Sequence, residues 1–176
     1  ISGLAQNEQQ LYILKYDSNG NSLGYLSVPF RPNTEGYQPK MINFTYDPLT
    51  QQYYFTSWRD SPYDDEYSTI INNQIYQTSI LICFNVTGQV LWTKTANNAS
   101  SAIVEGVLVD EQSNVYVSGR GTSSTVLPNG SNGPLNGNFG GYQFTNTLSR
   151  QSFVIKFNAQ GNLLWGSNAD GTAGDG

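Results

Sequence analysis

The chain has 176 residues and a formal net charge of −5, and charged residues make up only 12% of it. Its eight Lys and Arg residues form no basic footprint for nucleic acid, and no run of about 20 apolar residues is present to span a membrane as a helix. Histidine, the commonest general base and a frequent metal ligand, is absent, so we expect no enzyme, no cofactor and no metal site.

The first predicted element is a hairpin with strands at 11–16 and 23–28. Its turn is Asp17-Ser18-Asn19-Gly20, in which glycine supplies a positive φ. The same phrase recurs around Gly88 and then Gly161, at steps of 68 and 73 residues. The copies close on an aromatic residue: Tyr25, Trp92 and Trp165. A hairpin signal at a near-constant spacing predicts a repeat architecture.

A second kind of hairpin lies between these copies. Strands at 41–46 and 53–58 flank Asp47-Pro48, and strands at 104–109 and 115–119 flank Asp110, 63 residues later. The remaining strands are expected at 79–84, 90–95, 152–157 and 163–167. Each repeat then holds four antiparallel strands, which is typical of a propeller blade. A β-sandwich is the alternative, but it gives no reason for the spacing.

The predicted fold is all-β, because no window of helix length places apolar residues at a 3.6-residue period. Residues 1–40 are expected to hold a half blade and a connection, 41–102 and 103–167 a full blade each, and 168–176 the lead-in to another. About two and a half blades cannot close a ring of roughly 4–8. We therefore expect additional blades from the same longer chain or from a neighbouring subunit.

Two segments, 59–78 and 120–151, are longer than ordinary connections and join the second strand to the third in their blades. We expect both to emerge as loops on one face, beside the connections at 29–40 and 96–102. That face is the predicted interaction surface.

Several side chains are candidate binding residues. The acidic cluster Asp64-Asp65-Glu66 has the oxygen ligands of a hard cation, although acids in loops are usually only solvated. Aromatic residues of the long loops are candidates for stacking on carbohydrate: Tyr63, Tyr67, Tyr76 and Tyr142. Of the four Asn-x-Ser/Thr sequons, those at Asn98 and Asn129 lie in predicted loops and are candidate glycosylation sites.

Other residues are predicted to pack. Cys83 is the chain's single cysteine and lies in an apolar strand, so we expect a buried apolar side chain rather than a nucleophile. The strand-ending Trp92 and Trp165 are expected to pack between blades. Tyr53, Tyr54 and Tyr116 are expected to share that packing.

Residues 104–165 contain Asn114-Val115-Tyr116-Val117-Ser118-Gly119 and later Lys156-Phe157-Asn158-x-x-Gly161-Asn162-Leu163-Leu164-Trp165. This pattern resembles the SBBP (seven-bladed β-propeller) repeat family; 41–93 matches it more loosely and 11–26 as a half repeat. Residues 84–92 are also similar to the tryptophan-docking repeat of quinoprotein propellers, but this stretch lacks the cofactor and metal sites of those enzymes. The resemblance implies a propeller of the kind that occurs in bacterial surface and secreted proteins and in large DNA viruses.

Together these features predict a non-catalytic β-propeller module of a surface, secreted or particle-associated protein. It would present 59–78 and 120–151 to a protein or glycan partner, outside the cell, on its surface or on a virus particle. The alternative is a purely architectural component of a virion, a filament or a cell-surface layer. A fragment of a propeller enzyme is a minor alternative.

Overall fold

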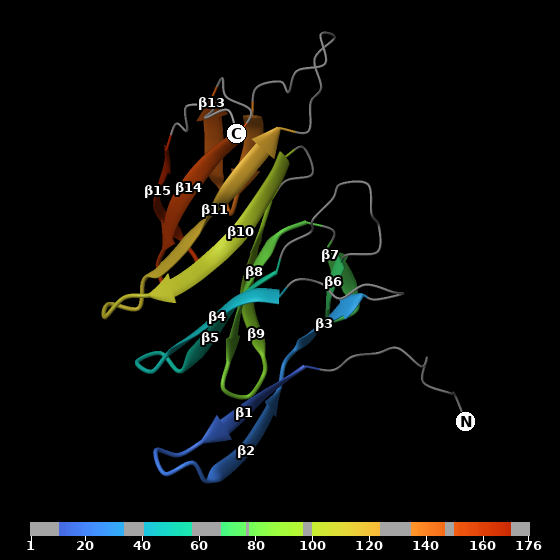
Figure 1. Cartoon of the computed structure of the whole chain (residues 1–176), viewed down its shortest axis with the longest axis vertical. Coiled ribbons are helices and arrows are strands. Elements are labelled where there is room, and N and C mark those ends of the chain that lie inside the picture. Colours follow the sequence, from blue (N-terminus) through green and yellow to red (C-terminus); the bar gives the residue numbers. More distant parts are fainter. Residues whose placement is uncertain are drawn as a thin grey trace, which may run out of the picture.

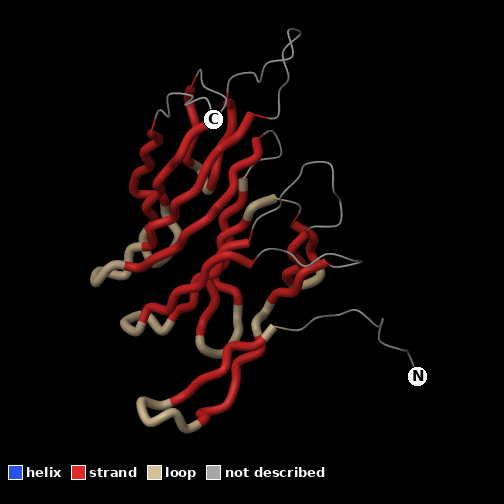
Figure 2. The backbone as a smooth tube through the Cα atoms, viewed as in Figure 1, coloured by secondary structure: helices blue, strands red, loops and turns tan. Residues whose placement is uncertain are grey.

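The computed structural model describes residues 11–33, 41–57, 68–76, 78–96, 100–123, 135–146 and 150–169. These residues form strands joined by turns, and none of them lies in a helix (Figure 2). All the strand pairs are antiparallel. The prediction of an all-β chain is therefore confirmed.

Three groups of strands account for all ten that the sequence predicts. The N-terminal hairpin is β1 (Tyr12–Tyr16) and β2 (Ser22–Ser27). The central sheet has the order β4 (Met41–Asp47), β5 (Gln52–Ser57), β8 (Ile80–Asn85) and β9 (Val90–Thr95). The C-terminal sheet has the order β10 (Ser100–Val109), β11 (Val115–Ser123), β14 (Arg150–Phe157) and β15 (Leu163–Ala169). Each sheet is thus a four-stranded meander.

Five further strands lie where the sequence predicted only loops and connections. They are β3 (Phe30–Asn33), β6 (Ser68–Ile71), β7 (Gln74–Tyr76), β12 (Leu135–Phe139) and β13 (Tyr142–Asn146). The hairpin β6–β7 falls between β5 and β8, and the hairpin β12–β13 falls between β11 and β14. We call them the inserted hairpins. The prediction that 59–78 and 120–151 are loops is therefore wrong for these parts.

Both inserted hairpins are anchored to the chain segment that precedes their sheet. Phe30 of β3 pairs with Ile71 of β6, and Ala96, just after β9, pairs with Phe139 of β12. Ile71 and Phe139 are buried. The hairpins therefore lie beside the connections, as predicted, but each contributes an apolar side chain to a core.

The turns after β1, β8 and β14 share one geometry. Gly20, Gly88 and Gly161 have φ values of 83°, 85° and 79°, which glycine adopts without strain. In each turn, the residue three positions before the glycine uses its side-chain oxygen as an acceptor. This oxygen accepts the backbone N–H groups of the residues two and four positions after its own. The accepting residues are Asp17, Asn85 and Asn158.

An irregularity of pairing also recurs in these three hairpins. The register shifts beside Lys15, Cys83 and Lys156, so that Leu23, Leu91 and Leu164 have no partner in the ladder. Trp92 then lies opposite Cys83, and Trp165 opposite Lys156.

The shift corrects one expectation about the N-terminal hairpin. The residue opposite Lys15 is Gly24, so Tyr25 does not occupy the position of the two tryptophans. Because a strand alternates its side chains between faces, this one-residue difference places Tyr25 on the other face of the hairpin.

The three groups form successive layers (Figure 1). The N-terminal hairpin is at the bottom of the view, the central sheet in the middle and the C-terminal sheet at the top. Side chains alternate across β5, so Tyr53 is buried against the N-terminal hairpin and Tyr54 against the C-terminal sheet. The central sheet is therefore covered on both faces, and the two cores are separate.

Specific contacts join the central sheet to the C-terminal sheet. Trp92 Nε1 donates to the Ala159 carbonyl oxygen at 2.9 Å, and the indole lies on Gly161 so closely that a Cβ there would be 2.8 Å from it. Asn43 Nδ2 donates to the Glu105 carbonyl oxygen at 2.9 Å. The predicted packing between sheets is confirmed for Trp92, whereas Trp165, for which the same packing was predicted, is 45% exposed on the outer face of the C-terminal sheet.

Candidate functional site

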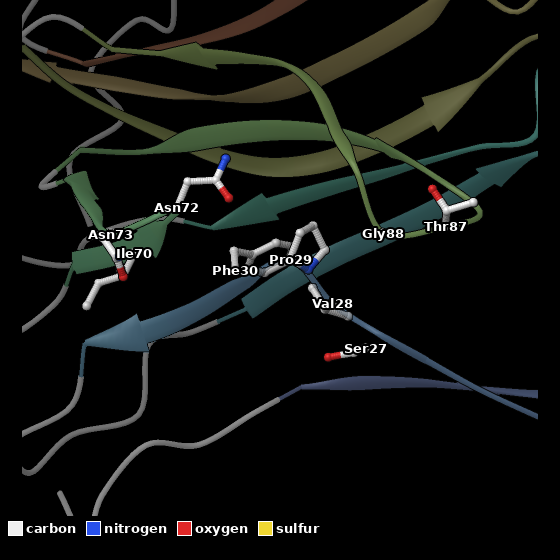
Figure 3. A pocket seen from close by; sticks show the side chains of 9 residues that line it. All are labelled: Ser27, Val28, Pro29, Phe30, Ile70, Asn72, Asn73, Thr87 and Gly88. Atoms are coloured by element: carbon white, nitrogen blue, oxygen red, sulfur yellow. The ribbon is translucent and has the colours of Figure 1, made fainter. Parts of the chain in front are cut away.

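A hollow lies beside the tip of β6–β7 (Figure 3). It has a volume of about 430 Å³. Three segments meet there: residues 27–30 after β2, residues 70–73 at the tip of β6–β7, and the β8–β9 turn. Its lining residues are Ser27, Val28, Pro29, Phe30, Ile70, Asn72, Asn73, Thr87 and Gly88.

The tip of the hairpin is a two-residue turn formed by Asn72 and Asn73. Their φ values are 49° and 64°, and asparagine tolerates this left-handed region better than most residues. Both side chains are exposed. The turn therefore presents two amide groups at the rim of the pocket.

The opposite rim is held by the β8–β9 turn. The Thr87 hydroxyl donates to Asn85 Oδ1 at 2.6 Å, which fixes its place in the turn. A Cβ at Gly88 would lie 3.1 Å from the Ser27 carbonyl oxygen, so glycine lets the turn approach the end of β2 closely. The rim is thus a rigid turn with one oriented hydroxyl.

The chemistry of the pocket is polar but uncharged. Hydroxyl and amide groups of Ser27, Asn72, Asn73 and Thr87 combine with the apolar surface of Pro29, and none of the described side chains that line it is acidic or basic. Such groups can donate to and accept from hydroxyls or peptide groups, but they supply no formal charge to offset that of an ionic ligand. The pocket suits an uncharged polar ligand.

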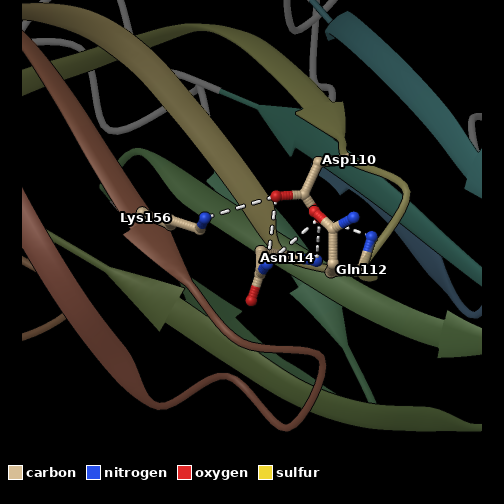
Figure 4. A network of polar contacts seen from close by, with 4 residues as sticks. All are labelled: Asp110, Gln112, Asn114 and Lys156. Atoms are coloured by element: carbon tan, nitrogen blue, oxygen red, sulfur yellow. Dashed lines mark hydrogen bonds and ion pairs between the residues drawn. The ribbon is translucent and has the colours of Figure 1, made fainter.

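A second polar network centres on Asp110, in the turn between β10 and β11 (Figure 4). Its Oδ1 accepts the backbone N–H groups of Gln112 and Asn114, and Lys156 Nζ lies 3.3 Å from its Oδ2. Desolvation opposes ionisation, but the bonds from Asn114 and Lys156 outweigh it and hold the pKa of Asp110 well below its usual value. A carboxylate held ionised in this way locks a turn and is a poor proton donor.

No metal site is assembled by the described residues. They contain no group of three or more His, Cys, Asp or Glu side chains placed to hold a metal ion. Burial raises the pKa of the Cys83 thiol to about 12, so it stays protonated. Cys83 is fully buried, which confirms its predicted packing role.

The structure keeps apart the two candidate tyrosines that it describes. Tyr76 is half-buried in β7. Tyr142 is half-buried in β13, where its ring packs on Gly166 and its hydroxyl donates to Asn168 Oδ1 at 2.6 Å. Seven other predicted site residues lie outside the described residues: Tyr63, Asp64, Asp65, Glu66, Tyr67, Asn98 and Asn129.

The sequence analysis did not single out Asn72, Asn73 and Thr87. The signal for the first two was present, because Asn-Asn between the apolar residues Ile70-Ile71 and Ile75-Tyr76 predicts a two-residue hairpin turn. Nothing in the sequence indicated that Thr87, from another hairpin, would lie across from them.

Comparison with models of known protein families and with curated proteins gave no match. Among the described residues there is also no helix of the length and apolar character that crossing a bilayer requires.

Proposed function

We propose that the chain has a β-propeller architecture of the SBBP type. Residues 41–102 and 103–167 would be two full blades, residues 1–40 would hold half of another, and 168–176 would lead into the next. The shared strand order, the inserted hairpin at the same point and the leucine bulges at the same register support this proposal.

We further propose a non-catalytic binding module that is secreted, exposed on a cell surface or carried on a particle. The observation that carries this proposal is the uncharged polar pocket at the tip of β6–β7, a hairpin from the segment 59–78. Its amides, hydroxyls and apolar floor match the hydroxyl-rich, uncharged surface of a neutral glycan. A protein loop presenting peptide groups is the other partner that these groups would accept.

The test removes the amides without changing the turn. Asn72→Gly with Asn73→Gly should keep the hairpin, because the other inserted hairpin turns on Gly140 and Gly141 with φ values of 58° and 95°. The wild-type chain and the double variant would be applied to an array of neutral and acidic glycans, with Gln143→Ala, an exposed change on β13, as the matched control.

Binding of neutral glycans by the wild type and by Gln143→Ala, and its loss in the double variant with an unchanged unfolding midpoint, would support the site. Equal binding by all three proteins would refute it. Binding confined to acidic glycans would also contradict an uncharged pocket.

The architectural alternative is favoured by a different observation. Large apolar side chains are exposed at both ends of the stack, among them Tyr25 at 69% and Leu108 at 57%. An architectural component would bind no glycan on the array and would instead associate through these ends.

A further inference from the structure

The outer face of the C-terminal sheet, the one turned away from the central sheet, carries a row of large side chains. Leu108, Tyr116, Lys156 and Trp165 lie side by side across its four strands. Leu108 is 57% exposed and Trp165 45% exposed. In the next row Val154 is 39% exposed. No described residue covers this face.

The corresponding face of the central sheet has the same row but is covered. Counted from the shared turn and bulge, the row is Thr45, Tyr54, Cys83 and Trp92. Tyr54 and Cys83 are fully buried beneath the C-terminal sheet. The difference between the two faces is therefore a neighbouring sheet and not a different pattern.

At the other end of the stack, the outer face of the N-terminal hairpin also carries exposed apolar side chains. Tyr12, Leu14 and Tyr16 of β1 are 54%, 63% and 57% exposed. By the same register they correspond to Phe153, Ile155 and Phe157, which are buried against the central sheet. The exposed face of the N-terminal hairpin is therefore equivalent to the face of the C-terminal sheet that packs on the central sheet.

The tryptophan contact provides an anchor for both faces. The Trp92 indole lies on Gly161, and its Nε1 donates to the Ala159 carbonyl oxygen; both residues belong to the β14–β15 turn of the C-terminal sheet. Trp165 occupies the position of Trp92, while Gly20 and Ser18 occupy those of Gly161 and Ala159. A Cβ at Gly20 would meet nothing within 4 Å, so the surface on which an indole would lie is open.

We propose that the outer face of β14–β15 binds the outer face of the N-terminal hairpin of a second copy of this chain, head to tail. Trp165 lies on Gly20 of the second copy, and its Nε1 donates to the Ser18 carbonyl oxygen. The contact is only two strands wide on one side, so association is weak and depends on concentration. A dimer formed in this way still has one unoccupied face of each kind, so the assembly extends beyond dimers or closes into a ring.

This inference rests on the proposed blade arrangement but not on ligand binding. Sedimentation velocity over a wide range of protein concentrations tests it with no glycan present. Two substitutions each block one half of the contact: Trp165→Glu, which also brings a carboxylate towards Asp17 of the second copy, and Leu14→Glu. Leu49→Glu, in the β4–β5 turn at 70% exposure, is the matched control.

We expect the wild type and Leu49→Glu to form species larger than dimers as concentration rises. Trp165→Glu and Leu14→Glu should each remain monomeric with wild-type circular dichroism. An equimolar mixture of these two variants should form dimers and nothing larger, because one intact face of each kind remains. The variant with glycines at 72 and 73 should associate like the wild type.

Three results would overturn the proposal. They are a wild type that stays monomeric at all concentrations, a Trp165→Glu protein that still self-associates, and a mixture that remains monomeric. Loss of glycan binding with intact association, or the reverse, shows which of the two proposals has failed.

Discussion

The central and C-terminal sheets carry the same pattern of strands, turns and bulges, but their environments differ. The central sheet is covered on both faces, whereas the described part of the chain covers the C-terminal sheet on one. At equivalent positions of the same row stand Cys83, fully buried, and Lys156, whose ammonium lies 4.7 Å from the centre of the Tyr116 ring. The comparison teaches that the neighbouring sheet decides what chemistry each position tolerates.

Lys156 shows how an uncovered position can be polar and still shield apolar surface. Its stem lies along the row while its ammonium reaches Asp110. The contact with Tyr116, and then that with Asp110, raise the pKa of Lys156. The same ammonium placed at Cys83 would have neither water nor a carboxylate beside it.

The largest expected effect comes from exchanging the chemistry of these two positions. Cys83→Lys buries an unpaired charge, which costs several kcal/mol, so we expect the chain not to fold. Lys156→Met should leave the urea midpoint close to that of the wild type, because methionine keeps an unbranched apolar stem and Asp110 keeps its hydrogen bonds from Asn114. Circular dichroism with urea titration measures both. A folded Cys83→Lys protein of wild-type stability would contradict the covered environment of that face.

The two tryptophans provide the next comparison. Trp92→Ala removes the indole that packs on Gly161 and Phe157, and should cost about 3 kcal/mol of unfolding free energy. Trp165→Ala should cost less than about 1 kcal/mol, because the residue is 45% exposed and its indole contacts the Tyr116 ring on an outer face. If urea titrations of the monomers showed equal losses of unfolding free energy for the two variants, the difference between the covered and the exposed tryptophan would be contradicted.

Substitution of two equivalent turn glycines, Gly20 and Gly161, extends the comparison between a covered and an exposed position. Alanine at Gly20 should cost roughly 1 kcal/mol, since it places a side chain at positive φ in open space. Alanine at Gly161 carries the same strain and in addition collides with Trp92, which should add roughly 1 kcal/mol or more. Thermal and urea unfolding of the two variants measure the difference. Introducing Trp92→Ala should relieve the extra cost at Gly161 alone.

The last comparison concerns Asp47, the final residue of β4, which is 1% exposed. Burial opposes its ionisation, but hydrogen bonds from Thr50, from Ser113 of the next sheet and from backbone amides hold its pKa below 3.8. Because the pKa of Asp47 is lower in the folded chain than in the unfolded chain, the ionised carboxylate stabilises the fold at pH values above its unfolded-state pKa. This stabilisation is lost as the pH falls through its folded-state pKa.

Asp47→Asn should therefore lower the unfolding free energy by about 1 kcal/mol at pH 7, because an amide replaces the carboxylate that accepts these bonds. The difference from the wild type should shrink as the pH falls below about 4. Stability measured from pH 7 to pH 3 checks this. A difference that stays constant over that range would show that the ionised carboxylate is not involved.

The sequence predicted the ten main strands because each has strong apolar or aromatic content and is joined to its partner by a recognisable turn. The inserted hairpins were missed for a physical reason. β12, with Asn136-Gly137-Asn138 before a Gly-Gly turn, has little strand propensity and depends on pairing with Ala96 and on the burial of Phe139. Such support comes from chain distant in sequence.

The candidate site likewise has one part that local sequence predicts and one part that depends on tertiary packing. The Asn72-Asn73 turn was readable from local sequence, but its position opposite Thr87 depends on how the hairpins pack. The shift that places Gly24 rather than Tyr25 opposite Lys15 was also invisible, because a bulge at Leu23 is a property of the paired strands.

The most direct test of the stacked, equivalent sheets is hydroxyl-radical footprinting of the monomer, read by mass spectrometry and normalised to the unfolded chain. Leu81, on the covered face of the central sheet, should be strongly protected and Trp92 partly protected, while their equivalents on the C-terminal sheet, Val154 and Trp165, should be oxidised rapidly. Similar oxidation rates within the pairs Leu81 and Val154, and Trp92 and Trp165, would contradict it.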